Sequence, residues 1–255
     1  MNRVLLSIWL LLSANLVSAE TFVLAFHRSP PYSDISETGK PFGMDMEISG
    51  AISRQMGIQL KTLNCPLARC LQLMKEGQSD LILGLIKTDE RQAFMAFVHP
   101  PYYTIEPAFA FYKKRDSDVS LDNYQGLQDY IIAVTRGGAY YERFDQDINL
   151  HKLEPLSVDN QLNLLLKNRV DLVIGVESTL DTTIGIMGLT DEVSKVAYRA
   201  YSPISAFMAV SRKSPLMGKL SEISAALLAI KKSGELGKIL IKYNIEDVDL
   251  VAKPN

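Results

Sequence analysis

Histidine, cysteine and tryptophan are scarce in this chain of 255 residues, which contains three His, two Cys and one Trp. The histidines, His27, His99 and His151, lack the spacing of metal ligands, and no serine stands near a matching base and acid. The sequence therefore gives no support to a zinc site or to a hydrolase of the Ser-His-Asp type. We expect no metal and no cofactor.

A basic excess is also missing from the sequence. Lys and Arg total 27 against 29 Asp and Glu, and the formal net charge is −2. Proteins that bind nucleic acids usually carry a strong positive charge or patch, so a nucleic acid is not expected as a partner. With 47% hydrophobic residues, a chain of this length can bury an ordinary globular core.

Long apolar runs are rare as well. One run, at residues 4–12, follows a short positive start at residues 1–3 and precedes three small or apolar residues at 17–19. This order is typical of a secretory signal peptide, and the run is short of the ~20 residues that a membrane span needs. We predict a signal peptide at residues 1–19 and export of the mature protein to the periplasm.

Export changes how the two cysteines, Cys65 and Cys70, are interpreted. In an oxidising compartment a cysteine pair is more often a disulfide than a metal site, so we expect these two to be bonded to each other. A metal site and a catalytic thiol are the weaker alternatives. Because a bond across so short a loop removes little chain entropy, its main effect would be to fix a local turn.

Strand-like and helix-like segments alternate along the chain. Apolar patterns predict strands at residues 22–27, 58–64 and 81–86, and apolar residues at helical spacing predict helices at residues 43–57 and 67–76. Such alternation is typical of α/β proteins, in which a mostly parallel sheet is flanked by helices.

One helix-turn-strand segment occurs twice. Residues 71–85 are echoed by residues 162–176, at an offset of 91 with no gap, and each copy has an Asp, Asp80 or Asp171, just before a buried strand. Chance similarity between two common α/β units is the alternative. We interpret the echo as a sign of two similar lobes.

The expected lobes each contain one copy of the echo. We predict that lobe 1 comprises residues 20–102 plus 203–255 and that lobe 2 comprises residues 103–202. The repeated strands end near Gly84 and Gly175. Open α/β sheets bind ligands at the carboxyl ends of their strands, so these two strand ends should face a common cleft.

A series of short motifs runs along the mature chain. In order, they are Pro30-Pro31-Tyr32, Gly43-Met44-Asp45-Met46-Glu47, Pro66-Leu67-Ala68-Arg69, Thr88-Asp89-Glu90-Arg91, Arg136-Gly137-Gly138 and Gly234-Glu235-Leu236-Gly237. By their order and spacing, the chain resembles the bacterial extracellular solute-binding proteins of family 3. The resemblance covers nearly the whole mature chain.

This resemblance implies a two-lobed periplasmic-binding fold of type II. Such a protein closes its lobes on a small molecule, here an anionic or amino-acid-like one, and delivers it as a monomer to an ABC permease or to a sensor. One alternative is an enzyme on the same scaffold, such as a dehydratase of cyclohexadienyl acids like prephenate, with Glu177 as the candidate general acid. Another is a structural or partner-binding protein that has lost its ligand.

The resemblance also assigns ligand contacts residue by residue. Arg91 falls on the arginine that grips the ligand's carboxylate, a role that suits a planar guanidinium. An ordinary salt bridge is the alternative role for Arg91. The positions that provide hydroxyl groups in amino-acid binders are Gly84, Ile86 and Gly138 here, and near Gly138 we expect backbone N–H groups to contact the ligand.

The position that holds the ligand's ammonium group departs from the family pattern. An aspartate is usual there, but this chain has Val176, followed by Glu177. A buried ammonium without a carboxylate partner would be costly. Either Glu177 turns inward to replace the aspartate, or the ligand lacks that group or presents it differently.

Five further residues are candidates for the cleft: Ser29, Tyr32, Leu67, Arg69 and Arg136. Together with the carboxylate-gripping arginine, the two additional arginines would favour an anionic ligand. The alternatives are that both are solvated or pair across the lobes, and that Tyr32 only packs against its Pro-Pro turn.

Overall fold

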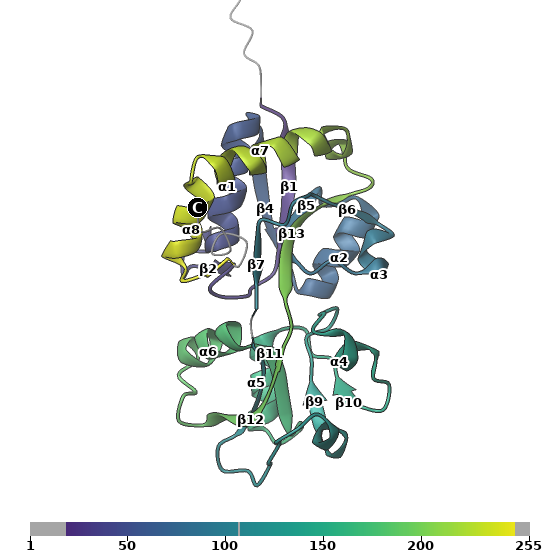
Figure 1. Ribbon diagram of the computed structural model, residues 1–255, viewed down its shortest axis with the longest axis vertical. Helices are drawn as coiled ribbons and strands as arrows, with labels where there is room; N and C mark the ends of the chain where they lie inside the picture. Colours follow the sequence, from purple (N-terminus) through teal and green to yellow (C-terminus); the bar gives the residue numbers. More distant parts are fainter. Residues whose placement is uncertain (1–18, 107, 248–255) are drawn as a thin grey trace, which may run out of the picture.

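The computed structural model describes residues 19–106 and 108–247 and divides them between two α/β lobes (Figure 1). The predicted signal peptide lies outside the described residues, apart from Ala19. None of the helices in the described ranges is long and apolar enough to span a bilayer.

The first lobe is built on a mixed sheet in the order β4-β1-β5-β13-β6, with β7 also pairing with β13. These strands are β1 (Thr21–Phe26), β4 (Gln59–Asn64), β5 (Leu81–Leu85), β6 (Met95–Phe97), β7 (Tyr103–Ile105) and β13 (Ile204–Ser211). Strand β1 runs parallel to β4 and β5, whereas β13 is antiparallel to β5, β6 and β7. A small hairpin, β2 (Asp34–Ile35) with β3 (Pro41–Phe42), lies beside this sheet.

Helices cover both faces of the first sheet. They are α1 (Met44–Met56), α2 (Leu67–Glu76), α3 (Asp89–Gln92), η2 (Pro215–Lys219), α7 (Leu220–Lys232) and α8 (Glu235–Lys242). Leu81 and Leu83 of β5 pack into the core shared with α1, α7 and α8, while Ile82 and Leu85 pack against α2. Burial on both faces explains why β5 is an almost uninterrupted apolar run.

The second lobe has a five-stranded sheet in the order β10-β9-β11-β8-β12. Its strands are β8 (Ala108–Lys114), β9 (Ile131–Ala133), β10 (His151–Leu153), β11 (Leu172–Val176) and β12 (Val193–Tyr201). Its helices are η1 (Gln125–Asp129), α4 (Glu142–Gln146), α5 (Val158–Leu166) and α6 (Glu177–Ile186). Two separate apolar clusters pack against this sheet, so each lobe has a core of its own.

The chain passes between the lobes twice, from β7 to β8 and from β12 to β13 (Figure 1). The two passages run side by side, because Ile105 pairs with Ile204 on one side of them and Ala108 pairs with Tyr201 on the other. Residues 103–105 join the first sheet through β13, although the sequence analysis placed them in the second lobe. A pair of short antiparallel connections is suited to hinge motion.

The internal echo corresponds to a repeated contact at the start of two parallel strands. Asp80 accepts a hydrogen bond from the backbone N–H of Val23 (2.7 Å) and donates its own N–H to the carbonyl oxygen of Val23 (2.9 Å). Asp171 makes the same two bonds with Ile131, at 2.8 and 2.9 Å. The repeated Asp therefore ties its strand to the neighbouring parallel strand, once in each sheet.

Replacing Asp80 by Ala should lower the free energy of unfolding by about 1–3 kcal/mol, because the N–H of Val23 loses its carboxylate partner in a partly buried place. Asp80 also accepts from the hydroxyl of Ser214 at 2.6 Å, so Asp171→Ala should cost less. Urea denaturation measures both changes, with Asp118→Ala in an exposed loop as the control. Equal stability of Asp80→Ala and Asp118→Ala would contradict the role assigned to the repeated Asp.

Candidate functional site

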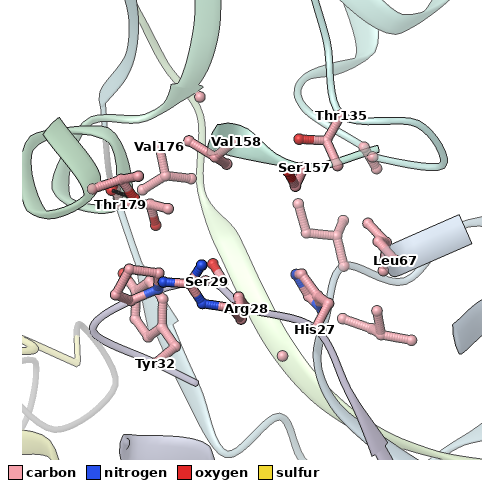
Figure 2. A pocket seen from close by; sticks show the side chains of 18 of the residues that line it. His27, Arg28, Ser29, Tyr32, Leu67, Thr135, Ser157, Val158, Val176 and Thr179 are labelled. Atoms are coloured by element: carbon pink, nitrogen blue, oxygen red, sulfur yellow. Dashed lines mark hydrogen bonds between the residues drawn. The ribbon is translucent and has the colours of Figure 1, made fainter. Parts of the chain in front are cut away.

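A cavity of about 320 Å³ lies between the lobes and is lined by residues of both. Figure 2 shows its two walls, with His27, Arg28, Ser29, Tyr32 and Leu67 on the lobe 1 side facing residues of lobe 2. The labelled lobe 2 residues are Thr135, Ser157, Val158, Val176 and Thr179. Several of these residues follow or end strands β1, β9 and β11, so the cavity lies where strands of both sheets end, as expected for open α/β sheets.

Arg91 is a buried cation in the lobe 1 wall, with only 5% of its surface exposed. It lies in the short helix α3, whose N-cap Thr88 accepts from the Arg91 N–H. Its guanidinium donates to the carbonyl oxygen of Ile86 (2.5 Å) and, across the cleft, to that of Gly137 (2.8 Å). In the described part of the chain, no carboxylate lies within ion-pair distance of it.

Burial lowers the pKa of Arg91 to about 10. The side chain is still cationic at neutral pH, so it holds a positive charge in a poorly hydrated place with only neutral carbonyl groups as hydrogen-bond partners. A guanidinium has five N–H donors, and Ile86 and Gly137 occupy two of them. The remaining donors are available to an anionic group, which would add to the weaker, longer-range attraction of Glu90 and Asp145.

His27 follows strand β1 and lines the same wall as Arg91. Burial, and then the positive charge of Arg91, lower the pKa of its imidazole to about 4. His27 is therefore neutral at physiological pH. The lobe 1 wall therefore places the Arg91 cation beside a neutral imidazole that can donate or accept a hydrogen bond.

Asp45 forms part of the cavity floor. Its carboxylate accepts from the hydroxyl groups of Tyr102 (2.7 Å) and Ser33 (3.1 Å), and burial raises its pKa to about 6. Gly84 has a φ of 74°, and a Cβ at this position would stand 2.9 Å from an Asp45 oxygen. A glycine is therefore needed where the sequence resemblance led us to compare Gly84 with a ligand-binding serine.

The lobe 2 wall is mostly neutral. The Thr135 hydroxyl accepts from the Gln161 amide at 3.1 Å, and the Ser157 hydroxyl caps α5 by accepting from the N–H of Asn160. Thr179 also lines the cavity, and its hydroxyl has no hydrogen-bond partner among the described residues. This wall offers hydroxyl groups between apolar side chains.

Three side-chain contacts bridge the lobes around the cavity. Besides the bond from Arg91 to Gly137, Arg28 donates to Asp159 at 2.7 Å, and the hydroxyls of Tyr32 and Ser178 lie 3.2 Å apart. Arg28 is also bonded to Asp34 of its own lobe at 2.7 Å. The structure therefore shows the two lobes closed on each other.

Seven of the ten predicted ligand contacts line the cavity. They are Ser29, Tyr32, Leu67, Gly84, Ile86, Arg91 and Gly138. The N–H of Gly138, however, donates to the Thr135 carbonyl at 2.8 Å, so this backbone group is already engaged in a turn.

Arg69 and Arg136 do not line the cavity, which corrects the expectation of three arginines at the cleft. Arg69 is exposed on the outer face of α2, 3.9 Å from Glu76 of the same helix. Arg136 is exposed and follows Thr135, whose side chain does face the cavity. Helical periodicity turns Arg69 outward, and Arg136 lies in the turn that follows β9.

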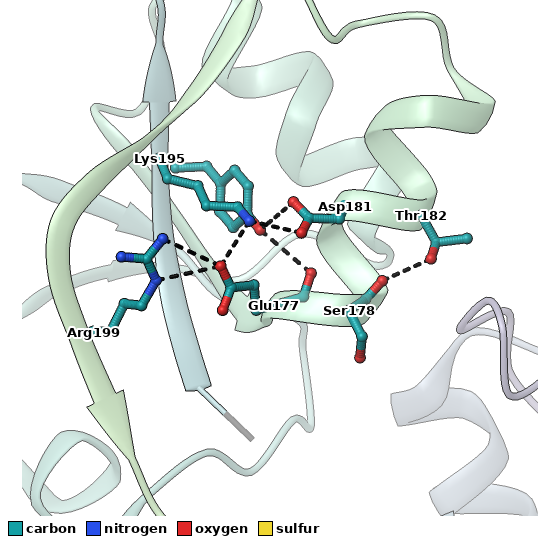
Figure 3. Close-up of polar contacts among 7 residues, drawn as sticks. Glu177, Ser178, Asp181, Thr182, Lys195 and Arg199 are labelled. Atoms are coloured by element: carbon teal, nitrogen blue, oxygen red, sulfur yellow. Dashed lines mark hydrogen bonds and ion pairs between the residues drawn. The ribbon is translucent and has the colours of Figure 1, made fainter. Parts of the chain in front are cut away.

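Glu177 is also drawn away from the cavity, and Figure 3 shows its partners. Its carboxylate lies 2.6 Å from the Lys195 amine and 3.3 Å from the Arg199 guanidinium, while Lys195 also contacts Asp181. Glu177 is therefore placed neither to replace an ammonium-binding aspartate nor to act as a general acid in the cleft. Two cations on β12 hold it against the body of lobe 2.

The predicted disulfide between Cys65 and Cys70 is confirmed. Cys65, Pro66 and Leu67 line the cavity, and Cys70 is fully buried beneath them. The bond thus fixes the turn that begins α2 against the lobe 1 wall.

The polar lining residues that the sequence analysis missed include His27, Arg28, Thr135, Ser157 and Asp159. His27 and Arg28 directly follow the predicted first strand, a position that favours ligand contact, so this signal was present. Asp159 gave no such signal, since it lies in the first turn of α5, where an acidic residue is common for helix stability alone. No group of three or more His, Cys, Asp and Glu in the described ranges is placed to hold a metal ion.

The sequence pattern of the bacterial extracellular solute-binding proteins, family 3, matches residues 23–246 of this chain. The chain belongs to this family. One relative is an arginine-binding periplasmic protein of Mannheimia haemolytica, 24% identical over 88% of this chain and 91% of its own length. Another is the amino-acid-binding protein AabA of Dichelobacter nodosus, 24% identical over 84% of this chain and 83% of its own length.

Solved structures show the same fold in other proteins. A histidine kinase sensor domain with similarity to periplasmic binding proteins has a TM-score of 0.77 at 23% identity, over 88% of this chain and 96% of that domain. An ancestral arginine-binding protein bound to arginine has a TM-score of 0.74 at 21% identity, over 88% and 97% of the two chains. The predicted two-lobed, type II periplasmic-binding fold is thus confirmed.

Asp159→Asn should shift the ligand-free protein toward an open arrangement, because it removes an ion pair that exists only when the lobes meet. Both partners are more than a third exposed, so the pair is worth about 0.2–1 kcal/mol, or up to about a five-fold change in the open-to-closed ratio. Distances between one spin label on each lobe measure the change. Glu235→Gln, which breaks the Arg54–Glu235 pair within lobe 1, is the control, and identical distance distributions would contradict the assignment.

The His27→Gln variant should keep a part of the free energy of unfolding that the wild type loses in acid. The pKa of His27 is about 4 in the folded protein and 6.5 in an ordinary setting, so below pH 6.5 the unfolded chain binds a proton that the folded one does not. The wild type should therefore lose about 3 kcal/mol relative to the variant between pH 6.5 and pH 4. Urea titrations at several pH values test this, with His151→Gln on an exposed residue as the control.

Proposed function

We propose that the protein captures a small organic carboxylate in the cavity between its lobes and that Arg91 holds the carboxylate group. The observation that carries the proposal is the buried guanidinium of Arg91, which has no carboxylate of the described residues within ion-pair distance. A bound anion stabilises a buried cation more strongly than it stabilises a cation that is exposed to water. A planar guanidinium also matches a carboxylate with two parallel hydrogen bonds.

Closure of the lobes follows from where the ligand would lie. A molecule in the cavity touches Arg91 and His27 on one wall and the hydroxyl groups of Thr135, Ser157 and Thr179 on the other. It therefore binds the closed arrangement better than the open one, and this difference in affinity is what shifts the population. The two antiparallel passages between the lobes are the natural hinge.

The mature protein would act in the periplasm and pass its ligand to an ABC permease or to a sensor. The signal-peptide pattern at residues 1–19, the disulfide, and the periplasmic relative of Mannheimia haemolytica support this location. The likeness to a kinase sensor domain and to arginine-binding proteins keeps both destinations open. The relatives' names point to amino acids, whose carboxylate Arg91 would bind. We propose that the protein is a monomer, because both walls of the cavity belong to one chain.

Arg91→Ala should weaken binding by about 2–5 kcal/mol, because it removes a charge-assisted contact from a largely dry place. Arg91→Lys should also bind more weakly, since a point charge does not reproduce the paired geometry. A panel of amino acids and mono-, di- and tricarboxylates is first screened by thermal shift, where a ligand at a hundred times its dissociation constant adds about 2.7 kcal/mol. Calorimetry then compares the variants on the compounds that bind.

The matched control is Arg69→Ala, which removes an exposed arginine that does not line the cavity and should leave affinity unchanged. Equal affinity of Arg91→Ala and wild type for every compound that binds would refute the carboxylate contact. The same holds if only sugars or other uncharged molecules shift the melting temperature.

A further inference from the structure

The carboxylates at the cavity differ from Arg91 in one respect: each is already engaged by a cation or by hydroxyl donors. Of the described lining residues, Asp45 and Asp159 are those that carry a carboxylate. Asp45 is 4% exposed and accepts from both Tyr102 and Ser33. Asp159 is paired with Arg28 at 2.7 Å. Arg91, in contrast, has a full positive charge and only carbonyl groups as partners.

The end of β11 provides no further acidic group. Val176 lines the cavity, and the next residue, Glu177, is held by Lys195 and Arg199 on the body of lobe 2. The hydroxyl groups of this wall, such as that of Thr179, are neutral. An ammonium group buried here would lose its hydration without gaining an ion-pair partner, and such burial is costly.

The rest of the cavity favours a hydrocarbon body. Aliphatic side chains line it on both sides: Leu67, Ile86 and Ile105 in lobe 1, and Val158 and Val176 in lobe 2. Pockets of this kind bind through apolar contact over most of their surface and use a few polar groups to orient the ligand. Here the strong orienting group is Arg91.

We propose that the ligand is an apolar carboxylate without an α-ammonium group, that is, an aliphatic or aromatic carboxylic acid rather than an α-amino acid. The inference rests on the proposed function and narrows it. The ligand's carboxylate binds Arg91, and its hydrocarbon body fills the apolar part of the cavity. The ligand has no ammonium group because the cavity wall has no unpaired carboxylate to receive one.

Pairs of compounds that differ only in the ammonium group test this directly. Hexanoate is compared with L-norleucine, and 3-phenylpropanoate with L-phenylalanine, by calorimetry on protein unfolded and refolded with its disulfide intact to remove any molecule carried through purification. In each pair that binds, the acid should bind about ten-fold or more tightly than the amino acid. An amino acid that binds as well as its acid would overturn the inference.

Val176→Asp places a carboxylate on the cavity wall and should narrow or reverse the preference within each pair. Val176→Asn is the matched control, because Asn is polar and nearly as large as Asp but carries no charge. This variant should not favour the amino acid. Melting curves of both variants verify that they fold. A Val176→Asp protein with the unchanged wild-type preference would count against the inference.

Two results separate this inference from the proposed function. An amino acid that outbinds its acid but loses its affinity in Arg91→Ala overturns the inference and leaves carboxylate binding at Arg91 intact. If no member of either pair binds, whereas a dicarboxylate binds through Arg91, the inference again fails and the proposed function stands.

Discussion

The charge of Arg91 is the constraint around which the site is built. A cation buried between two lobes is tolerated only if its donors are used, and the structure satisfies two of them with carbonyl groups from opposite sides of the cleft, Ile86 and Gly137. The bond to Gly137 forms only when the lobes meet, so the same side chain that attracts an anion also helps to close the cleft. Burial, and in second place the charge of Arg91, keep the neighbouring His27 neutral. Recognition and part of the closure therefore depend on one guanidinium, which also contributes to the protonation state of the wall.

The direct contacts between the lobes have a consequence for affinity. The contacts of Arg28 with Asp159 and of Tyr32 with Ser178 are small, partly exposed interactions, so they bias the lobes toward each other without locking them. A ligand gains affinity when the closed state is already populated, because less of its binding free energy is used to bring the lobes together. Since Arg28 keeps Asp34 as a second partner, its charge stays compensated when the lobes separate, and opening leaves mainly Asp159 unpaired.

Local patterns in the sequence were sufficient to predict most of the scaffold. The helix expected at 67–76 is α2 (Leu67–Glu76), and the buried apolar run at 81–86 is β5 (Leu81–Leu85), because hydrophobic periodicity depends on the element itself. Short strands such as β9 (Ile131–Ala133) have too few residues to show a period. The direction of Glu177 depended on Lys195 and Arg199, which are distant in the sequence, and the Arg28–Asp159 pair depended on the relative placement of the two lobes. Such long-range contacts leave no local signal.

The position of β13 in the first sheet imposes an order on folding. This strand lies between β5 and β6, yet it is made only after the whole of the second lobe. Lobe 2 is one continuous stretch with its own core, and its sheet is complete once β12 has been made. The lobe 1 sheet is complete only when β13, a strand near the C-terminal end of the chain, has been added. Contacts between distant segments form slowly, so the closing of the first sheet around β13 is the step that completes the lobe 1 wall and places it opposite the wall of lobe 2.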